Sequence, residues 1–395
     1  MSKSPYYQIK IKDTGEDITK YVTDFVHEDC LEEDDLLKFS LNDINQDFIE
    51  NSSIEKGTTI LFQYGYLGYK ITNAAFAVVK RIEPKFGDII RLSITCLDKG
   101  SNMKRNASSK IWKNQTASQI IKTIVERYSL ELVSEPTKKV YSSIPQGNRT
   151  DFEFIRYLTG IEQSGSYIFY IKEFKAYFVK RDLKKEPAIT FTYRDGTGKV
   201  IAFSPVESDE GDKNAKTEAS VSSVNPVTGE TINATASPDK LAEGEGFMGN
   251  AAGELLEIKN TDTSNTTGQN IPFPARTQED AVNVVNAENK KASLKSMTAS
   301  LVIEGDTLIK SGDLISIAGV PSRYAGVWRV IKVTHTINGG GYISTLELDR
   351  NIPTAKTKAS DINKKVGPKQ GEETKKVYNY DKNGNRIDGG ASGDY

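Results

Sequence analysis

Residues 76–98, FAVVKRIEPKFGDIIRLSITCLD, align without a gap with residues 327–349, VWRVIKVTHTINGGGYISTLELD. Both stretches alternate apolar and polar residues around a short break, which predicts a β-hairpin in each. Val79 falls on Val330, and three further aligned pairs are identical: Ser93 with Ser344, Leu97 with Leu348, and Asp98 with Asp349. Either the chain carries one strand module twice, or two hairpins with the same alternation merely look alike.

A glycine-led strand precedes each copy, GTTILF at residues 57–62 and GDLISI at residues 312–317. Strands also recur through the first hundred residues, separated by Gly, Asn, Asp and Pro. This spacing favours closure of the sheet over an open edge. We therefore predict a mainly β chain with an α+β insertion and two related small β-barrels. Three such chains around an axis would form a pseudo-sixfold ring.

Two capping boxes mark helices in the middle of the chain. Thr116 begins the sequence T-A-S-Q, and Thr150 is followed by Glu153 at the third position, the arrangement that satisfies free N–H groups at a helix start. Apolar residues follow each box at helical spacing. Thr277 with Asp280 predicts a third helix start. Residues 167–179 have the alternation of a hairpin, which completes a small α/β unit.

The composition divides the chain into five parts. Between residues 207 and 272 the sequence is rich in Ser, Thr, Asn and Gly and has 12 acidic and 4 basic residues, which is typical of a solvated segment without a core. The predicted parts are a first β-barrel (1–105), a small α/β domain (106–190), a second β-barrel (191–206 with 276–352), an acidic flexible linker or insertion (207–275), and a polar C-terminal tail (353–395).

Charge and hydropathy exclude several classes of partner. The 52 basic residues nearly balance the 53 acidic residues, so no global positive field favours nucleic acid. No apolar run has the length of a membrane span, and the first residues do not have the pattern of a signal peptide. Cys30 and Cys96 are too few for a disulfide framework and are expected to be small buried residues in a protein made in a reducing cytoplasm.

The order of these parts resembles the phage late control protein D family, which also supplies the hub portion of VgrG-type spike proteins. Four stretches carry the resemblance: KGTTILFQYGYLGYK, NQTASQIIKTIVERYSL, SIPQGNRTDFEFIRYLTGIEQSGSYIFY, and SGDLISIAGVPSRYAGVWRVIKVTHTINGGGYISTLELD. Two sets of residues within them are the most specific: Gln146, Asp151, Phe152, Ile155, Leu158 and Gly165, and Gly326, Trp328, Val330, His335, Tyr342, Thr345 and Leu348.

The resemblance implies a structural baseplate hub of a contractile phage tail or phage-like injection system. Such a hub is a homotrimer that joins the hexameric tail tube to a trimeric spike and meets baseplate wedge or LysM-type adaptor proteins. It is assembled in the bacterial cytoplasm and becomes part of a virion tail or a released injection particle. The family has no reaction or cofactor of its own. Because no β-helical repeats follow the second predicted barrel, the spike is expected to be a separate protein.

Candidate sites for chemistry each have a simpler reading. His335 and His27 are the only histidines, too few for a multi-histidine metal centre, and a lone histidine on a strand usually packs or forms a hydrogen bond. The acidic residues between 28 and 35 lack the spacing of a calcium loop, so a solvated edge is favoured. No carboxylate pair or nucleophile motif stands out. A hub-associated peptidoglycan hydrolase remains the enzyme alternative.

The tail contains the run VYNYDKNGNRI at residues 377–387, in which Asn-Gly favours a tight turn. Disorder is the simpler reading. The alternative is a hairpin that orders by adding to a partner's sheet edge, with Tyr378, Tyr380 and Ile387 as candidate spike or partner contacts. Two further functions stay open for the chain as a whole: a tail-tip adapter of a non-contractile phage, and a secreted carbohydrate-binding protein, which the sparse tryptophans disfavour.

Overall fold

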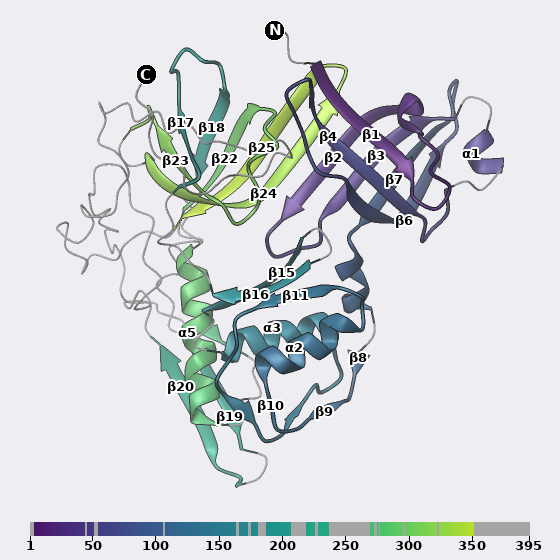
Figure 1. Cartoon of the computed structure of the whole chain (residues 1–395). Coiled ribbons are helices and arrows are strands. Elements are labelled where there is room, and N and C mark those ends of the chain that lie inside the picture. Colours follow the sequence, from purple (N-terminus) through teal and green to yellow (C-terminus); the bar gives the residue numbers. More distant parts are fainter. Residues whose placement is uncertain are drawn as a thin grey trace.

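The computed structural model describes residues 4–350, with gaps. The residues outside the description are 1–3, 44–45, 51–53, 106, 163–165, 173–174, 181–186, 207–218, 226–227, 237–268, 272–274, 276, 295–296, 322–323 and 351–395. The described part is mainly β, as predicted, with an α/β unit below two groups of strands (Figure 1).

The first group of strands, module 1, comes from the first hundred residues. Its strands are β1 (Ser4–Ile11), β2 (Val22–Cys30), β3 (Leu36–Asn42), β4 (Thr59–Leu67), β5 (Lys70–Ile71), β6 (Ala75–Lys85) and β7 (Arg91–Leu97). Its short helices are η1 (Thr19–Tyr21) and α1 (Asp47–Glu50). The second group, module 2, consists of β17 (Ile189–Thr192), β18 (Val200–Val206), β22 (Met297–Glu304), β23 (Leu314–Ala318), β24 (Gly326–Asn338) and β25 (Gly341–Arg350).

The two modules have the same strand order. Module 1 runs β1-β4-β6-β7-β3-β2, and module 2 runs β17-β23-β24-β25-β22-β18. They differ in their first pair, since β1 is antiparallel to β4 whereas β17 is parallel to β23. Each module has its own apolar core, around Phe25 and Phe39 in module 1 and around Trp328 and Val330 in module 2.

The prediction of two separate barrels needs correction. Over the described residues the strands form one sheet in which β2 of module 1 pairs with β24 of module 2, and the path ends openly at β1 and β18. The outer edge of β2, which would have to pair with β1 to close module 1 into a barrel, pairs with β24 of module 2 instead. Alternation along a strand predicts which face is buried, but it carries no information about which neighbour takes each edge.

The repeat is present in the geometry of the backbone. Gly57 N donates to Val79 O at 2.9 Å, and Val79 N donates to Thr58 O at 2.9 Å. In module 2 the equivalent bonds run from Gly312 N to Val330 O at 2.7 Å and from Val330 N to Asp313 O at 2.9 Å. Both glycines have a positive φ, which favours a residue without a Cβ.

A β-bulge follows each of the two equivalent valines, between Val79 and Arg81 in β6 and between Val330 and Lys332 in β24. A bulge bends a strand and increases its twist. The strands β6 and β24 are therefore bent at equivalent positions. The second strand of the hairpin is displaced by one residue from the gapless alignment. Val79 faces Cys96, but Val330 faces Leu348, the residue aligned with Leu97. The identities in that half of the alignment therefore do not mark equivalent positions.

The α/β unit has the two predicted helices, α2 (Ala117–Glu126) and α3 (Asp151–Ile161). Both capping boxes are formed, by Thr116 with Gln119 and by Thr150 with Glu153. The remaining elements are η2 (Lys99–Lys104), β8 (Ala107–Ser108), β9 (Ile111–Trp112), β10 (Gln115–Thr116), β11 (Glu131–Ser134), β12 (Val140–Tyr141), β13 (Ile144–Pro145), β14 (Arg149–Thr150), β15 (Tyr167–Lys172) and β16 (Lys175–Lys180).

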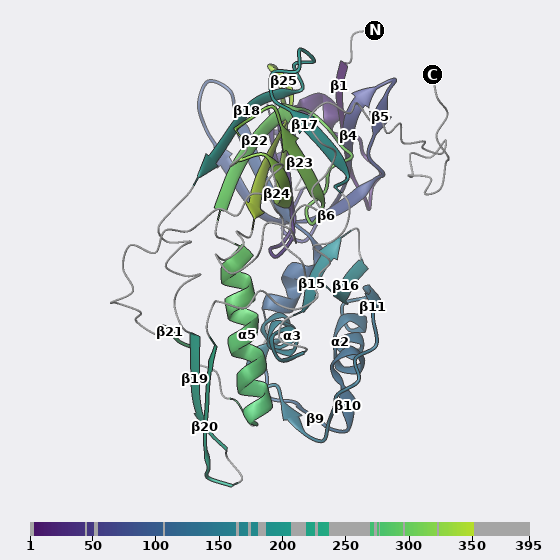
Figure 2. The ribbon, with the colours of Figure 1, turned by 90° about the vertical axis from the view of Figure 1, so that its left-hand side faces the viewer.

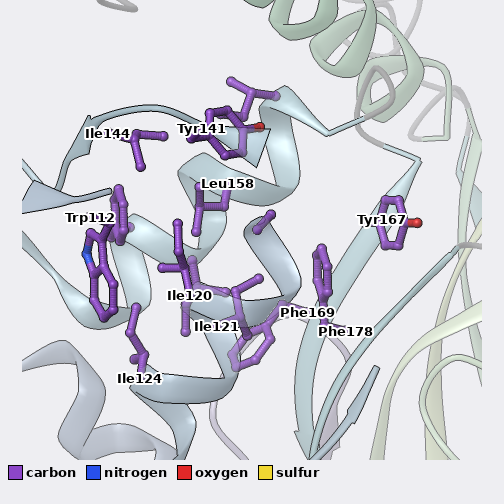
Figure 3. Packing of buried hydrophobic residues seen from close by; sticks show 14 of the residues in the cluster. Trp112, Ile120, Ile121, Ile124, Tyr141, Ile144, Leu158, Tyr167, Phe169 and Phe178 are labelled. Atoms are coloured by element: carbon purple, nitrogen blue, oxygen red, sulfur yellow. The ribbon is translucent and has the colours of Figure 1, made fainter. Parts of the chain in front are cut away.

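Side chains from the two helices and from the β11-β16-β15 sheet meet in one core. Ile120 and Ile121 of α2 point toward Phe169 and Phe178 of the sheet (Figure 3). The buried Gln146 donates to the Asp151 carboxylate at 2.8 Å and so fixes the start of α3. Burial of these apolar side chains is the main favourable contribution to the folding free energy of the unit.

The predicted linker contains structure that its composition concealed. Strands β19 (Ala219–Val224), β20 (Thr231–Ala236) and β21 (Gln269–Asn270) form a small sheet beside α5 (Gln278–Leu294) (Figure 2). Val221, Ile232 and Ala234 are buried in the core of the α/β unit. The segment does not form a core of its own. Its three small apolar side chains pack into the core of the neighbouring α/β unit, and this packing anchors the small sheet.

Helix α5 also lies elsewhere than predicted. Its start is capped as expected, with Asp280 N donating to Thr277 Oγ1 at 3.1 Å. However, Ala281, Val284 and Val285 join the α/β core and not module 2, to which the sequence assigned residues 276–352. Lys139 ties the helix to the unit through an ion pair with Asp280 at 3.1 Å.

Candidate assembly interface

The seam between the modules is a six-residue antiparallel ladder. It runs from Phe25 opposite Ile337 to Cys30 opposite Lys332, and Leu31 N donates to Ile331 O at 3.0 Å. The bulge makes this pairing possible: beyond it, β24 has left its neighbour β23 and presents an open edge to β2. Module 1 and module 2 are thus joined edge to edge.

Two histidines face each other in the seam, His335 buried and His27 partly buried. His27 pairs with His335 in the ladder, and their rings lie 6.1 Å apart at an interplanar angle of 9°. His27 Nδ1 is 3.0 Å from Tyr64 Oη, and His335 Nδ1 is 2.9 Å from Tyr342 Oη and 3.0 Å from Ser344 Oγ. Burial lowers the pKa of His27 to about 4 and the pKa of His335 to about 3. At neutral pH the seam therefore holds two neutral imidazoles.

Asp29 connects the two modules and the α/β unit. Its carboxylate accepts hydrogen bonds from Ser311 N at 2.9 Å and Ser311 Oγ at 2.8 Å, and it lies 3.2 Å from Lys172 Nζ. Lys172 Nζ also donates to Ser311 O at 2.5 Å. Burial acts to raise the pKa of Asp29, but the Lys172 cation and the two Ser311 hydrogen bonds outweigh it and hold this pKa below its ordinary value. The three parts of the molecule are held by one buried network.

Two other acidic residues of the segment 28–35, Asp34 and Asp35, have different partners. Asp34 forms an ion pair with Lys104 at 2.9 Å, and Asp35 accepts a hydrogen bond from Cys30 N at 2.9 Å. Burial raises the pKa of Asp35 well above its ordinary value, and the nearby Asp29 charge adds to this. Within residues 4–350, as far as they are described, no three His, Cys, Asp or Glu side chains converge as metal ligands.

Several strand edges remain open in the described part of the chain, among them those of β17 and β18 and parts of β1 and β6. β18 pairs with β22 on one side, and no described strand lies on its other side. In β6, the residues beyond the bulge pair with β7, whereas β4 reaches only as far as Val78. These residues, Arg81 to Lys85, are mostly exposed. Unpaired N–H and C=O groups on such edges can continue a sheet into another chain.

The sequence pointed to His335 but missed its partners. Nothing in the sequence indicates that His27 lies opposite it, or that Asp29 meets Lys172 and Ser311, because these contacts depend on the seam. Tyr378, Tyr380 and Ile387, the predicted partner contacts, lie outside the described residues. Cys30 and Cys96 are buried and unpaired, as predicted. No helix in the described ranges is long and apolar enough to cross a membrane.

Solved structures share this fold. The 43 kDa tail protein of prophage MuSo2 from Shewanella oneidensis aligns with a TM-score of 0.63 and 14% identity, over 87% of this chain and 98% of that chain. A tail protein from Neisseria meningitidis MC58 aligns with a TM-score of 0.60 and 10% identity, over 88% and 96%.

An Escherichia coli component of the type VI secretion system, described as similar to the bacteriophage T4 tail proteins gp27 and gp5, aligns with a TM-score of 0.51 and 12% identity, over 88% and 77%. The fold is thus that of phage tail proteins and a type VI secretion component. No curated protein matches the sequence. The family model described as the Alg8 N-terminal domain matches residues 44–339, more than half of the sequence, and the chain belongs to that family.

Proposed function

We propose that this chain is the structural baseplate hub of a contractile phage tail or phage-like injection system. The observation that carries the proposal is the duplicated module, with its repeated strand order, bulge and glycine hydrogen bonds. Three chains with two modules each would offer six similar docking surfaces to a hexameric tail tube and keep threefold symmetry for a trimeric spike. The tail-protein fold supports this role.

The proposed work of the hub is to match symmetries and transmit force, not to catalyse a reaction. Its partners would be two further copies of itself, the tube, the spike, and baseplate wedge or LysM-type adaptor proteins. The buried Asp29 network and the β2–β24 ladder would make each chain a rigid unit under load. Each copy is expected to bury more than about 1,000 Å² against its neighbours, as permanent assemblies do.

Co-sedimentation tests this proposal. The full chain is mixed with candidate tube and spike proteins from the same source and is compared with the chain alone over a range of concentrations. We expect a species with the mass of a trimer and a larger complex that contains all three proteins. A chain that remains monomeric at every concentration and in the presence of both partners would refute the hub.

The tail provides a second prediction. We propose that Tyr378, Tyr380 and Ile387 add to a sheet edge of the spike, since Asn-Gly favours a turn between two short runs. Removal of residues 370–395 is then expected to weaken spike binding at least about tenfold, the loss of roughly 1.4 kcal/mol of contact, and to leave self-association unchanged. The matched control removes residues 388–395 only and keeps full binding. Unchanged spike binding after the longer deletion would contradict the contact.

A further inference from the structure

A cleft lies between module 1 and the α/β unit. It has a volume of about 540 Å³ and is lined by the β2–β3 turn on one side and by η2 and the start of α3 on the other. Three half-buried apolar side chains contribute to its lining: Leu36, Leu97 and Phe152. The volume is within the range of about 300–1,000 Å³ that is typical of ligand pockets.

The cleft carries an excess of negative charge. Its lining contains five carboxylates and two cations, a net charge of −3: Glu28, Glu32, Glu33, Asp34 and Glu153 against Lys104 and Arg156. Lys104 pairs with Asp34 at 2.9 Å, and Arg156 lies 3.9 Å from Glu32. Both cations also lie over the ring of Phe152, at 4.5 and 5.9 Å from its centroid. The cleft thus already holds cations against carboxylates and an aromatic face, and its own cations do not balance its carboxylates.

The same chain contains a segment of opposite charge. Residues 353–369, PTAKTKASDINKKVGPK, have five lysines and one aspartate, a net charge of +4. Residues 370–395 have four basic and five acidic residues, a net charge of −1. The positive charge of the sequence after β25 is therefore concentrated in its first part. Val366 follows the lysine pair Lys364 and Lys365 and adds an apolar side chain.

The end of β25 places this segment within reach of the cleft. Cys30, which lines the cleft, is opposite Lys332, and Lys332 is opposite Glu347 of β25. Because neighbouring strands are about 4.8 Å apart, Glu347 is about 10 Å from Cys30, and Arg350 is about 10 Å further along β25. Residues 351–364 can span about 45 Å when extended. The segment can therefore reach the cleft without any change in the described strands.

We propose that residues 353–369 bind in this cleft of their own chain, with Lys364 and Lys365 at its carboxylates and Val366 against Phe152. The bound segment bridges module 1 and the α/β unit and fixes the point from which residues 370–395 leave them. Single exposed ion pairs contribute little and are screened by salt, so the binding depends on several pairs acting together with the apolar contact. The inference does not depend on the number of copies in an assembly.

A spin label in the full chain tests this binding. Ser360→Cys carries the label inside the segment, and Ser392→Cys carries it outside the segment as the matched control. Cys30 and Cys96 are buried, and the unsubstituted chain treated with the same reagent measures any labelling of them. Electron paramagnetic resonance then reports the mobility of each label. We expect an immobilised component at Ser360→Cys that is the same at every protein concentration, and none at Ser392→Cys.

Charge reversal identifies the two binding surfaces. In the Ser360→Cys chain, Lys364→Glu with Lys365→Glu should lower the ratio of immobilised to mobile label at least about tenfold, equal to roughly 1.4 kcal/mol. Lys375→Glu with Lys376→Glu makes the same change of charge at a second lysine pair and should leave the ratio unchanged. Glu33→Lys in the cleft should also lower the ratio. Its combination with the reversals at Lys364 and Lys365 should restore part of it, which a variant that had failed to fold could not do.

Equal mobility of the two labels would overturn the proposal. Immobilisation that appears only as the protein concentration rises would place the segment on another chain and would also overturn it. An equal response to the two lysine-pair reversals would show attraction by charge alone, without a defined site. A label that stays immobilised in the Glu33→Lys chain would place the segment outside the cleft.

Discussion

Replacing Lys172 with methionine is expected to lower the free energy of unfolding by about 3–5 kcal/mol, because removing one partner of a buried ion pair leaves the other charge uncompensated. Methionine keeps most of the apolar stem of the lysine, so the change removes the charge and little packing. The Asp29 carboxylate would retain only its Ser311 hydrogen bonds. Urea denaturation followed by fluorescence measures the loss.

Lys175→Met provides the matched control. Lys175 forms an ion pair with Glu131 at 3.0 Å, and both side chains are about half exposed or more. Exposed pairs contribute roughly 0–1 kcal/mol, so this variant should unfold close to the wild type. Equal losses for Lys172→Met and Lys175→Met would show that the network does not hold the three parts together.

Replacing His335 with glutamine should change how stability depends on pH. Burial lowers the pKa of His27 to about 4 and the pKa of His335 to about 3, below the ordinary value of 6.5. Between pH 6.5 and about 4 the unfolded chain therefore binds protons at these histidines that the folded chain does not bind. Stability falls as pH falls through this window, by about 1.4 kcal/mol per pH unit for each histidine.

The comparison of variant with wild type isolates this effect. Asp98, whose pKa burial raises to about 6, acts in the opposite direction, but it is present in both proteins and cancels in the difference. The stability advantage of wild type over His335→Gln should shrink by about 2 kcal/mol from pH 6.5 to pH 5. Ser344→Ala, which removes a contact of His335 and no titrating group, should give a nearly constant difference. A constant difference for His335→Gln as well would contradict a neutral, buried seam.

The local parts of this fold could be predicted from the sequence. Thr116, Thr150 and Thr277 begin helices as expected, because a helix start requires acceptors for its free N–H groups within a few residues. The hairpins were also recognised, since period-two alternation shows which side chains face a core.

The features that depend on distant pairing could not be predicted. The repeat was recognised from the aligned Val79 and Val330, but the register of the second strand differs by one residue, which a gapless alignment cannot detect. Val221 and Ile232 lie in a polar segment whose composition indicated a linker, yet a neighbouring core buries them. The seam follows from which strand edges remain open, and no local pattern encodes that choice.

The central claim is that the repeated module turns a threefold assembly into an approximately sixfold one. Electron cryomicroscopy of the purified full-length chain, with its tube and spike proteins, tests it most directly. We predict a ring of three chains in which six similar strand modules alternate. A ring of any other copy number, or three chains whose modules do not lie in one ring, would contradict it.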